Sequence, residues 1–300
     1  MKISKIPFFL GKEVSVDSGI YTNDMHPVCI KVTSDSVDYM VRFHSEYNPN
    51  AILREQKALD CLYEAHGGWQ PQIIECRNDG KREEQYLIKT FIPGKSLEKY
   101  GPEELRYHFS FLVQEISYYF INLRKVSSGQ FHSFIGDDYS SYSDLLSTHA
   151  YKHIDAISKY DPNSGKHLSE GVEILRTKGY MMEDIIPTFI HYDVKPQNII
   201  FEPKIPKITI IDYEHSRFGD PLHDLVRSRL RATENSKFYN NIWFDVEANM
   251  AGVFGKPCST LDNIYQIYTL ISYLPYFYKT NKQSRIDSTK HSILDCLHRL

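Results

Sequence analysis

The chain has 300 residues, of which 41% are hydrophobic and 24% are charged. This composition allows a large buried core and excludes an intrinsically disordered protein. The formal net charge of -3 excludes the general excess of basic residues that attracts nucleic acid or an anionic membrane surface. We therefore expect one large or two modest folded domains, with no nucleic-acid or membrane partner.

The cysteine pattern and the apolar runs bear on the compartment. The five cysteines are scattered and include no Cys-x-x-Cys pair, so neither a disulfide framework nor a thiolate zinc site is predicted. The apolar run from Ile6 to Leu10 is too short for the core of a signal peptide. The run from Tyr268 to Tyr278 is shorter than the ~20 residues that span a bilayer. These patterns favour a soluble protein of a reducing compartment, which we expect to be the cytoplasm.

The N-terminal third reads as five strands and one helix. Short β-branched and apolar runs separated by turn-forming residues predict strands, and helical spacing of apolar residues predicts one helix after the third strand. The expected strands are Glu13 to Asp17, Val28 to Thr33, Val37 to Phe43, Gln72 to Cys76 and Tyr86 to Phe91, and the expected helix is Asn50 to Glu64. Together they predict a small antiparallel α+β domain over residues 1–92.

After Pro93-Gly94 the pattern becomes mainly helical. Helical spacing predicts helices over Pro102 to Arg124, Tyr142 to Tyr160 and Leu168 to Lys178, and again beyond Pro221. Strand-like runs interrupt this pattern at Phe189 to Phe201 and Ile208 to Tyr213. We expect a second domain over residues 93–300.

One polar constellation carries recognisable chemistry. His191-Tyr192-Asp193-Val194-Lys195-Pro196-Gln197-Asn198 is followed by two apolar runs, the second of which ends at Asp212. Phosphoryl transfer to a hydroxyl needs a carboxylate that orients the acceptor and takes its proton, and oxygen ligands that hold a divalent metal ion. If the two apolar runs pair as a hairpin, Asn198 and Asp212 lie at the same end of it. The spacing thus predicts a site for phosphoryl transfer.

The motif resembles that of the protein-kinase-like superfamily, and more closely its aminoglycoside phosphotransferase and choline kinase-like branch. Ile211-Asp212-Tyr213-Glu214 stands where protein kinases have Asp-Phe-Gly. Gly219-Asp220-Pro221-Leu222-His223-Asp224-Leu225 matches the GDPxxDL signature of small-molecule kinases. No Ala-Pro-Glu triplet follows, which disfavours a protein kinase and a protein substrate.

The resemblance implies a two-lobed α+β fold, with a nucleotide-binding N lobe over residues 1–92 and a C lobe that carries the catalytic loop and binds the acceptor. In the N lobe it implies that Arg42 contacts the nucleotide phosphates and that Glu55 orients Arg42, with Lys31 as the rival cation. It further implies that adenine pairs with the main chain at about Thr90 and Ile92. The loop that covers the phosphates would be Ser18 to Met25.

The same resemblance implies an ATP-dependent kinase, with GTP as a possible donor. Asp193 would be the catalytic base, and Asn198 and Asp212 would hold Mg²⁺. Lys195 would stabilise charge on the transferred phosphate, or would simply be an exposed lysine; both readings stay open. The implied acceptor is a hydroxyl group of an antibiotic of the aminoglycoside type or of a metabolite such as choline, another amino alcohol or a sugar. An antibiotic acceptor would make the protein a resistance enzyme. The alternative from another class is a nucleotide-binding pseudokinase or regulatory module.

Other residues have structural or functional readings. His191 is expected to be structural, and Asp224 to tie down the catalytic loop by hydrogen bonds. The aromatic residues after Asp220 fit a helical core better than a cage for a quaternary ammonium group, and Arg227, Arg229 and Arg231 fit a solvated helix face better than an anion site. The carboxylates that could face a polycationic acceptor are few: Glu234, Asp245, Glu247 and Asp262.

Overall fold

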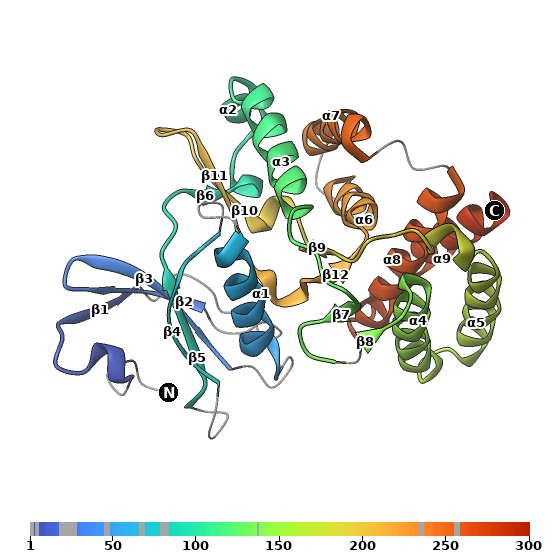
Figure 1. Ribbon diagram of the computed structural model, residues 1–300, viewed down its shortest axis with the longest axis horizontal. Coiled ribbons are helices and arrows are strands. Elements are labelled where there is room, and N and C mark those ends of the chain that lie inside the picture. Colours follow the sequence, from blue (N-terminus) through green and yellow to red (C-terminus); the bar gives the residue numbers. More distant parts are fainter. Residues whose placement is uncertain are drawn as a thin grey trace. The chain divides into compact units, whose positions relative to one another are not determined.

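The computed structural model describes residues 3, 6–17, 29–44, 49–65, 70–78, 84–136, 138–233, 237–254 and 259–300. The chain forms two compact units (Figure 1). Unit 1 comprises Met1–Asn122, Ser133–Gly136 and Asp193–Arg217, and unit 2 comprises Leu123–His132, Asp137–Tyr192 and Phe218–Leu300. The lobe boundary near residue 92 stays a prediction.

Unit 1 contains the expected five-stranded antiparallel sheet. Its strands are β1 (Val14–Asp17), β2 (Cys29–Ser34), β3 (Val37–Phe43), β4 (Ile73–Arg77) and β5 (Tyr86–Thr90), in the order β1-β2-β3-β5-β4. The helix α1 (Ala51–Ala65) follows β3 and packs against β4 and β5 (Figure 1). These bounds lie within one or two residues of the sequence predictions, because each element has its own periodicity and its own turn residues.

The strand register places the charged side chains of the sheet on one face, which we call the polar face, and a layer of apolar side chains on the other. Arg42 lies opposite Cys29 on β2 and Leu87 on β5, and Met40 lies opposite Lys31 and Lys89. Cross-strand partners point to the same face of a sheet, so these six side chains share one face. The opposite face is apolar and buries Val32, Val41, Tyr86 and Ile88 against Ile6 and Phe9, beside the short helix η2 (Pro7–Phe9).

A second, three-stranded sheet in unit 1 has the order β11-β10-β6. It is formed by β6 (Lys95–Ser96), β10 (Ile199–Glu202) and β11 (Lys207–Ile210). Gly94 enters β6 with a φ of 108°, and a Cβ at this position would collide with the carbonyl of Phe201. Glycine therefore permits the close approach of β6 to β10.

The helix expected over Pro102 to Arg124 is divided in two, which corrects the prediction. After the short helix η4 (Leu97–Lys99), the chain forms α2 (Pro102–Arg106) and α3 (Phe109–Leu123). At the break, the His108 amide donates to the carbonyl of Leu105, which is three residues back rather than four. The local apolar spacing continues through this turn, so periodicity alone could not reveal the break.

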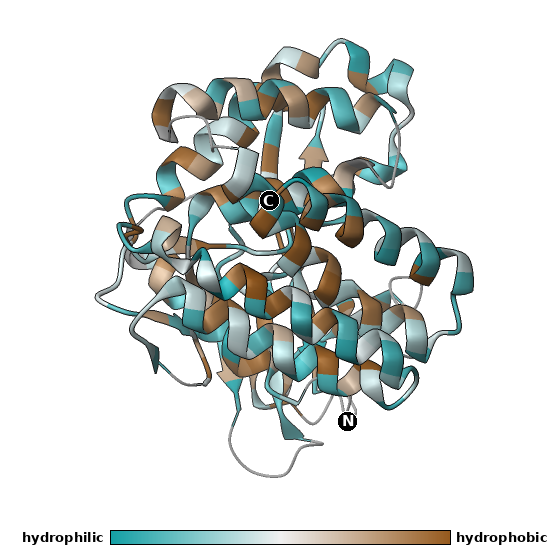
Figure 2. Ribbon diagram, turned by 90° about the vertical axis from the view of Figure 1, so that its right-hand side faces the viewer, coloured by the Kyte–Doolittle hydropathy of each residue, from teal (hydrophilic) through white to brown (hydrophobic). Residues whose placement is uncertain are grey.

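Unit 2 is mainly helical. Its helices are α4 (Tyr142–Ser158), α5 (Pro162–Thr177), α6 (Pro221–Thr233), α7 (Lys237–Phe254), α8 (Ser259–Lys279) and α9 (Gln283–His298), with the short helix η5 (Gly179–Met182). The strands β7 (Phe131–Ser133), β8 (Asp138–Tyr139), β9 (Thr188–Ile190) and β12 (Arg217–Gly219) form a sheet in the order β8-β7-β12-β9. Hydrophobic and hydrophilic residues alternate along the helices in Figure 2, which fits helices with one buried and one exposed face.

Helix α8 supplies much of the unit 2 core. Residues Ile264, Tyr265, Ile267, Tyr268, Ile271 and Leu274 are buried, in one cluster with residues of α4, α5 and α9. The helix continues through Pro275. Within the described ranges, no helix is both long enough and apolar enough to cross a bilayer.

Helix α5 starts six residues earlier than predicted, at Pro162. Asp161 caps the helix, and its carboxylate accepts hydrogen bonds from the amide of Ser164 at 3.0 Å and from the Ser164 hydroxyl at 2.5 Å. The signal was present in the sequence as an N-cap residue followed by proline at the first helical position. The apolar spacing used for the prediction begins only at Leu168, which explains the error.

The cap at Asp161 should make stability depend on pH. The hydrogen bonds from Ser164 hold the pKa of this carboxyl well below its ordinary value, with smaller contributions from Tyr278 and Lys290. A depressed pKa stabilises the fold at pH values above the unfolded-state pKa of about 3.9, and the effect is lost as the pH falls through the folded-state value. We expect Asp161→Asn to lower the free energy of unfolding by about 0.5–1 kcal/mol at neutral pH, and the difference to shrink below about pH 4.

Urea unfolding of both proteins over a pH series measures this difference. A difference that stays constant or grows on acidification would contradict the prediction. Asp155→Asn, at an exposed carboxylate in the interior of α4, serves as the control.

Candidate active site

The hairpin of β10 and β11 places two of the expected metal ligands at one end. Ile199 pairs with Ile210, and the amide of Ile211 donates to the carbonyl of Asn198 at 2.9 Å. Asn198 ends the short helix η6 (Pro196–Asn198) just before β10, and Asp212 follows β11. The hairpin inferred from the sequence is therefore confirmed.

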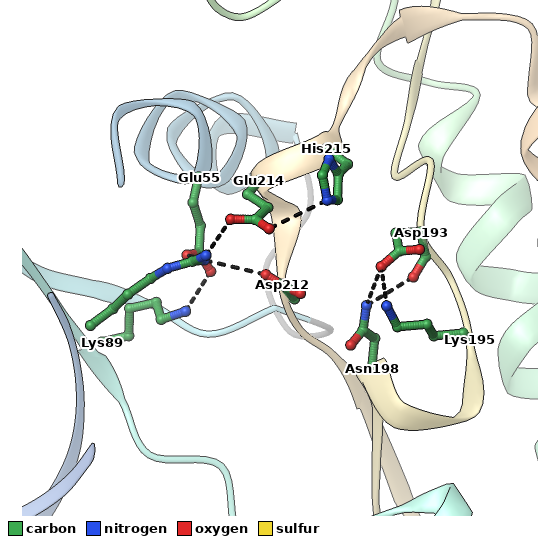
Figure 3. Close-up of polar contacts among 9 residues, drawn as sticks. Glu55, Lys89, Asp193, Lys195, Asn198, Asp212, Glu214 and His215 are labelled. Atoms are coloured by element: carbon green, nitrogen blue, oxygen red, sulfur yellow. Dashed lines mark hydrogen bonds and ion pairs between the residues drawn. The ribbon is translucent and has the colours of Figure 1, made fainter. Parts of the chain in front are cut away.

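Asp193, Lys195 and Asn198 form one group of hydrogen-bonded side chains (Figure 3). The ammonium group of Lys195 lies 2.5 Å from Oδ2 of Asp193. The amide nitrogen of Asn198 donates to the main-chain carbonyl of Asp193 at 2.9 Å and to its Oδ2 at 3.1 Å. Asp193 is only 3% exposed, so its carboxylate is held in place by neighbours rather than by water.

Arg42, Glu55 and Asp212 form a second group, together with two residues that the sequence reading did not include. One terminal nitrogen of Arg42, Nη1, donates to Glu55 on α1 and to Oδ1 of Asp212 at 3.2 Å. The other, Nη2, donates to Glu214, and Lys89 on β5 donates to the second oxygen of Glu55 (Figure 3). The planar guanidinium suits this arrangement, since it presents several donors in a fixed fork.

Every charge in this second group except that of Asp212 is almost fully buried. Arg42, Glu55, Lys89 and Glu214 are at most 6% exposed, whereas the side chain of Asp212 is 32% exposed. Burial disfavours the charge on Glu55, but Lys89 and then Arg42 outweigh it and lower the pKa of this carboxyl. Burial likewise opposes ionisation of Glu214, yet Arg42 lowers its pKa to about 2. Glu55 and Glu214 therefore stay ionised at neutral pH.

Asp212 occupies a backbone conformation that is uncommon for a residue with a side chain. Its φ is 70° and its ψ is 61°, in the left-handed region, and it leads into the short helix η7 (Tyr213–His215) that carries Glu214. Such conformations gather at functional sites because the surrounding structure must hold them there. The turn directs Asp212 and Glu214 to the same guanidinium.

The structure separates the rival cations on the polar face of the sheet. Lys31 forms an ion pair with Asp38 at 2.7 Å and lies over the ring of Phe91, so Glu55 is bound by Arg42 and Lys89 instead. Thr90 ends β5, and its amide donates to the carbonyl of Gln72. The pairing of adenine with the main chain at this residue stays a prediction. Ile92 follows two residues later, and the loop Ser18 to Met25 lies outside the described residues.

The residues present fit a magnesium ion bound with a nucleotide. Because the amide nitrogen of Asn198 is directed at Asp193, its amide oxygen is the atom that can serve as a ligand. Asp212 adds a partly exposed carboxylate. Within the described ranges, no group of three or more His, Cys, Asp or Glu side chains is arranged to hold a metal ion. Two oxygen ligands are nevertheless typical of Mg²⁺, which retains waters and takes substrate phosphates as its other ligands.

The GDPxxDL segment stabilises the start of the catalytic loop within unit 2. Asp224 is fully buried, and its two carboxylate oxygens accept hydrogen bonds from the amides of His191 and Tyr192 at 2.8 and 2.9 Å. This arrangement confirms that Asp224 ties down the loop. Gly219 is required for packing, since a Cβ there would come within 2.8 Å of the ring of Tyr142.

Comparisons with known proteins agree with the motif. Residues 182–250 match the family model described as the phosphotransferase enzyme family. The resemblance to this family is confirmed. No curated protein matches the sequence significantly. The matched residues contain Asp193, Asn198, Asp212 and the GDPxxDL segment of this phosphotransferase-like chain.

Solved structures show that the fold is the two-lobed, protein-kinase-like α+β fold. A thermostable mutant of aminoglycoside phosphotransferase APH(4)-Ia, in ternary complex with AMP-PNP and hygromycin B, has a TM-score of 0.75 at 12% identity over 98% of each chain. A putative fructosamine-3-kinase from Haemophilus somnus has a TM-score of 0.66 at 14% identity, over 96% of this chain and 92% of its own. A Plasmodium vivax ethanolamine kinase has a TM-score of 0.61 at 14% identity, over 95% of this chain and 81% of its own. The family match and these folds support a kinase with a hydroxyl acceptor.

The residues considered as acceptor contacts have mostly structural environments. Tyr239, Trp243, Tyr265, Tyr268 and Tyr273 are buried, which supports the core reading over an aromatic cage. Arg227 is buried and its Nε donates to the carbonyl of Tyr192, and Arg229 binds both Glu247 and Asp262 at 3.1 and 2.8 Å. The reading as a solvated helix face is therefore wrong for Arg227, whereas the side chain of Arg229 is 28% exposed. Glu234 lies outside the described residues.

A cavity of about 420 Å³ lies between α6, α7 and α8 in unit 2. Apolar side chains line most of it, and the polar part is the bridge from Arg229 to Glu247 and Asp262. Burial raises the pKa of Glu247, and Arg229 counteracts this effect. The two carboxylates of this cavity share the single positive charge of Arg229, which leaves about one negative charge to attract a polycation.

Lys89 and Glu214 are the residues that sequence reasoning missed. Lys89 stands in the otherwise apolar strand Tyr86-Leu87-Ile88-Lys89-Thr90, and a lone lysine in a buried strand signals a charged partner. Glu214 was noted as part of the Ile211 to Glu214 segment without a role. Its partner, Arg42, lies 172 positions earlier in the chain, and no local pattern connects the two.

Proposed function

We propose that the protein is an ATP-dependent kinase that transfers the γ-phosphate to a hydroxyl group of a small molecule. The observation that carries this proposal is the grouping of Asp193, Lys195 and Asn198 at the hairpin end that also bears Asp212. This arrangement supplies a base, a cation and two metal ligands from a segment of 20 residues. The match to the phosphotransferase family over residues 182–250 supports the same reaction.

Asp193 acts on the acceptor in this proposal. Its carboxylate accepts a hydrogen bond from the acceptor hydroxyl, orients the oxygen toward the phosphorus and takes the proton as the new oxygen–phosphorus bond forms. Asn198 and Lys195 fix the carboxylate through the contacts to Oδ2. Lys195 also brings a positive charge to the side of Asp193, where it can stabilise negative charge on the transferred phosphate.

The remaining predicted residues bind the donor. Asn198 and Asp212 would hold Mg²⁺, which when bound neutralises charge on the nucleotide phosphates. Arg42 contacts those phosphates and Glu55 orients its guanidinium. Adenine pairs with the main chain at Thr90 and Ile92. GTP can use the same phosphate contacts, so the donor screen includes both nucleotides.

The proposed acceptor is an antibiotic of the aminoglycoside type or a hydroxylated metabolite. Similarity of the fold to an aminoglycoside phosphotransferase favours the antibiotic. The two carboxylates that share the charge of Arg229 favour an acceptor with few positive charges. The buried tyrosines of α8 give no specific support to a choline-like acceptor. If the antibiotic is the acceptor, phosphorylation would confer resistance.

A thermal-shift screen tests the proposal, because a ligand that binds the native state raises the apparent melting temperature. ATP and GTP are added with and without Mg²⁺, alone and with aminoglycosides, other hydroxylated antibiotics, amino alcohols and sugars. A metal-dependent nucleotide shift together with phosphate incorporation into one acceptor class supports the kinase. A nucleotide shift without phosphate transfer to any acceptor would favour the pseudokinase, and no nucleotide shift at saturating concentration would refute the proposal.

Asp212→Asn should separate metal binding from nucleotide binding. The variant keeps the size of the side chain but removes a charged oxygen ligand, so we expect turnover to fall by at least about 100-fold. The extra stabilisation that Mg²⁺ adds to that from nucleotide should disappear. Phosphate release and thermal shift with and without Mg²⁺ measure both effects. Glu98→Gln, at an exposed carboxylate of η4, is the control, and unchanged turnover in Asp212→Asn would overturn the metal assignment.

A further inference from the structure

Lys89 is a buried cation on the polar face of the five-stranded sheet. It is 6% exposed and lies opposite Met40 on β3, one position before Thr90. Its ammonium group donates to Glu55, whose carboxylate is fully buried. Because burying a lysine charge is unfavourable without a partner, this contact is the one that permits a lysine at the position.

Glu55 therefore binds two cations that come from two different strands. Arg42 on β3 donates to one carboxylate oxygen and Lys89 on β5 donates to the other. Lys89 and Arg42 both lower the pKa of Glu55. Lys89 donates to Glu55, whereas Arg42 is shared among Glu55, Asp212 and Glu214.

We propose that Lys89 is a positioning residue of the nucleotide site, which fixes Glu55 from β5 so that Arg42 is ready to bind phosphate before the nucleotide arrives. The inference rests on the proposed kinase function and adds to it a residue and a role. In protein kinases the pairing of the strand cation with the helix glutamate is a controlled step. In this protein, Lys89 would keep Glu55 in position to pair with Arg42 whether or not a nucleotide is bound.

Charge balance gives the physical reason. Arg42 and Lys89 face the carboxylates of Glu55, Asp212 and Glu214, so the five side chains carry a net charge of about −1 when all are ionised. Without Lys89 the net charge becomes about −2, and Glu55 keeps only Arg42 as a partner among the described residues. Arg42 would then be held more tightly by carboxylates, and the phosphates would meet a more negative site.

The test uses the full chain and measures nucleotide affinity directly. Calorimetric titration with Mg²⁺-ATP gives Kd for the wild type, Lys89→Met and the control Lys57→Met, which changes an exposed lysine of α1 two positions after Glu55. We expect Lys89→Met to raise Kd by about tenfold or more and Lys57→Met to leave it unchanged. Lys89→Arg, which keeps the charge, should restore most of the affinity. If Lys89→Met does not fold, Lys89→Gln takes its place. This variant removes the charge but keeps a hydrogen-bond donor, and its Kd for Mg²⁺-ATP is compared with that of the wild type in the same way.

A double-mutant cycle distinguishes positioning from simple packing. If Lys89 acts through Glu55, Lys89→Met should change Kd much less in the Glu55→Gln background than in the wild type. Equal losses in both backgrounds, or an unchanged Kd in folded Lys89→Met and Lys89→Gln, would overturn the inference. Absence of Mg²⁺-ATP binding by the wild type would instead refute the kinase function on which it rests.

Discussion

Replacement of Asp193 by asparagine is expected to lower turnover by about 100- to 10,000-fold, because general-base catalysis contributes a factor of that order. The side chain of the variant has one amide oxygen, which can take the place of Oδ2, and its amide nitrogen can neither accept a hydrogen bond from the acceptor hydroxyl nor take its proton. Lys195 and Asn198 both donate to Oδ2 of Asp193. Because the amide oxygen of asparagine can accept both hydrogen bonds, the loop should keep most of its geometry. Nucleotide affinity should therefore change little.

Steady-state kinetics and Mg²⁺-ATP titration of the same preparation measure the two effects. Asp184→Asn, at an exposed carboxylate nine residues earlier in the chain, is the control. Turnover within a few-fold of the wild type would remove Asp193 from the catalytic role. Loss of nucleotide affinity in parallel with turnover would instead assign the residue to donor binding.

Arg42→Met should destabilise the protein by about 3–5 kcal/mol at neutral pH, which is the cost of breaking a buried ion pair by removing one partner. Glu55 would keep Lys89, but Asp212 and Glu214 would both lose the guanidinium. Binding of Mg²⁺-ATP should also weaken, since the residue proposed to contact the phosphates is absent. Urea unfolding and nucleotide titration measure the two losses, and Arg106→Met on α2 changes an exposed arginine as the control.

The loss of stability in Arg42→Met should depend on pH. In the wild type, Arg42 holds the pKa of Glu214 at about 2, below its ordinary value of about 4.3, so ionised Glu214 stabilises the fold above the ordinary value. Without Arg42, burial raises this pKa above the unfolded-state value, and the penalty is relieved as the pH falls. The difference in free energy of unfolding between Arg42→Met and the wild type should therefore narrow from pH 7 toward pH 4. The loss caused by Arg42→Met should also be smaller when Glu214 is replaced by glutamine. A difference that is independent of pH would contradict this account.

Much of the fold could be predicted because each element carries a local signal. The strand Val37–Phe43 and the helix that follows it were found from alternation, helical spacing and turn residues. The errors arose where a non-periodic feature decided the boundary. The cap at Asp161 starts α5 before its apolar stripe begins, and the hydrogen bond from His108 to Leu105 interrupts a stripe that continues in the sequence.

The site was predictable where a motif fixes it and unpredictable where distant residues meet. Asp193, Asn198 and Asp212 could be chosen because their spacing suits a loop followed by a hairpin, and the register of β10 with β11 confirms that hairpin. The contact of Arg42 with Glu55 followed from the resemblance and is present. Lys89 and Glu214 were missed because their importance comes from partners 34 and 172 positions away.

The division of unit 1 into three chain segments affects how the protein can fold during synthesis. Arg42 leaves the ribosome long before Asp212 and Glu214, so its buried ion pairs with them cannot form until about 170 further residues have been made. The sheet of β6 and β10 must likewise wait for Phe201 to reach Lys95. Contacts that close such long loops slow folding, so we expect the last step in the folding of unit 1 to be the docking of Asp193–Arg217 onto its other segments. Until then the polar face of the five-stranded sheet would lack two of its carboxylates, and Arg42 and Lys89 would share the single carboxylate of Glu55.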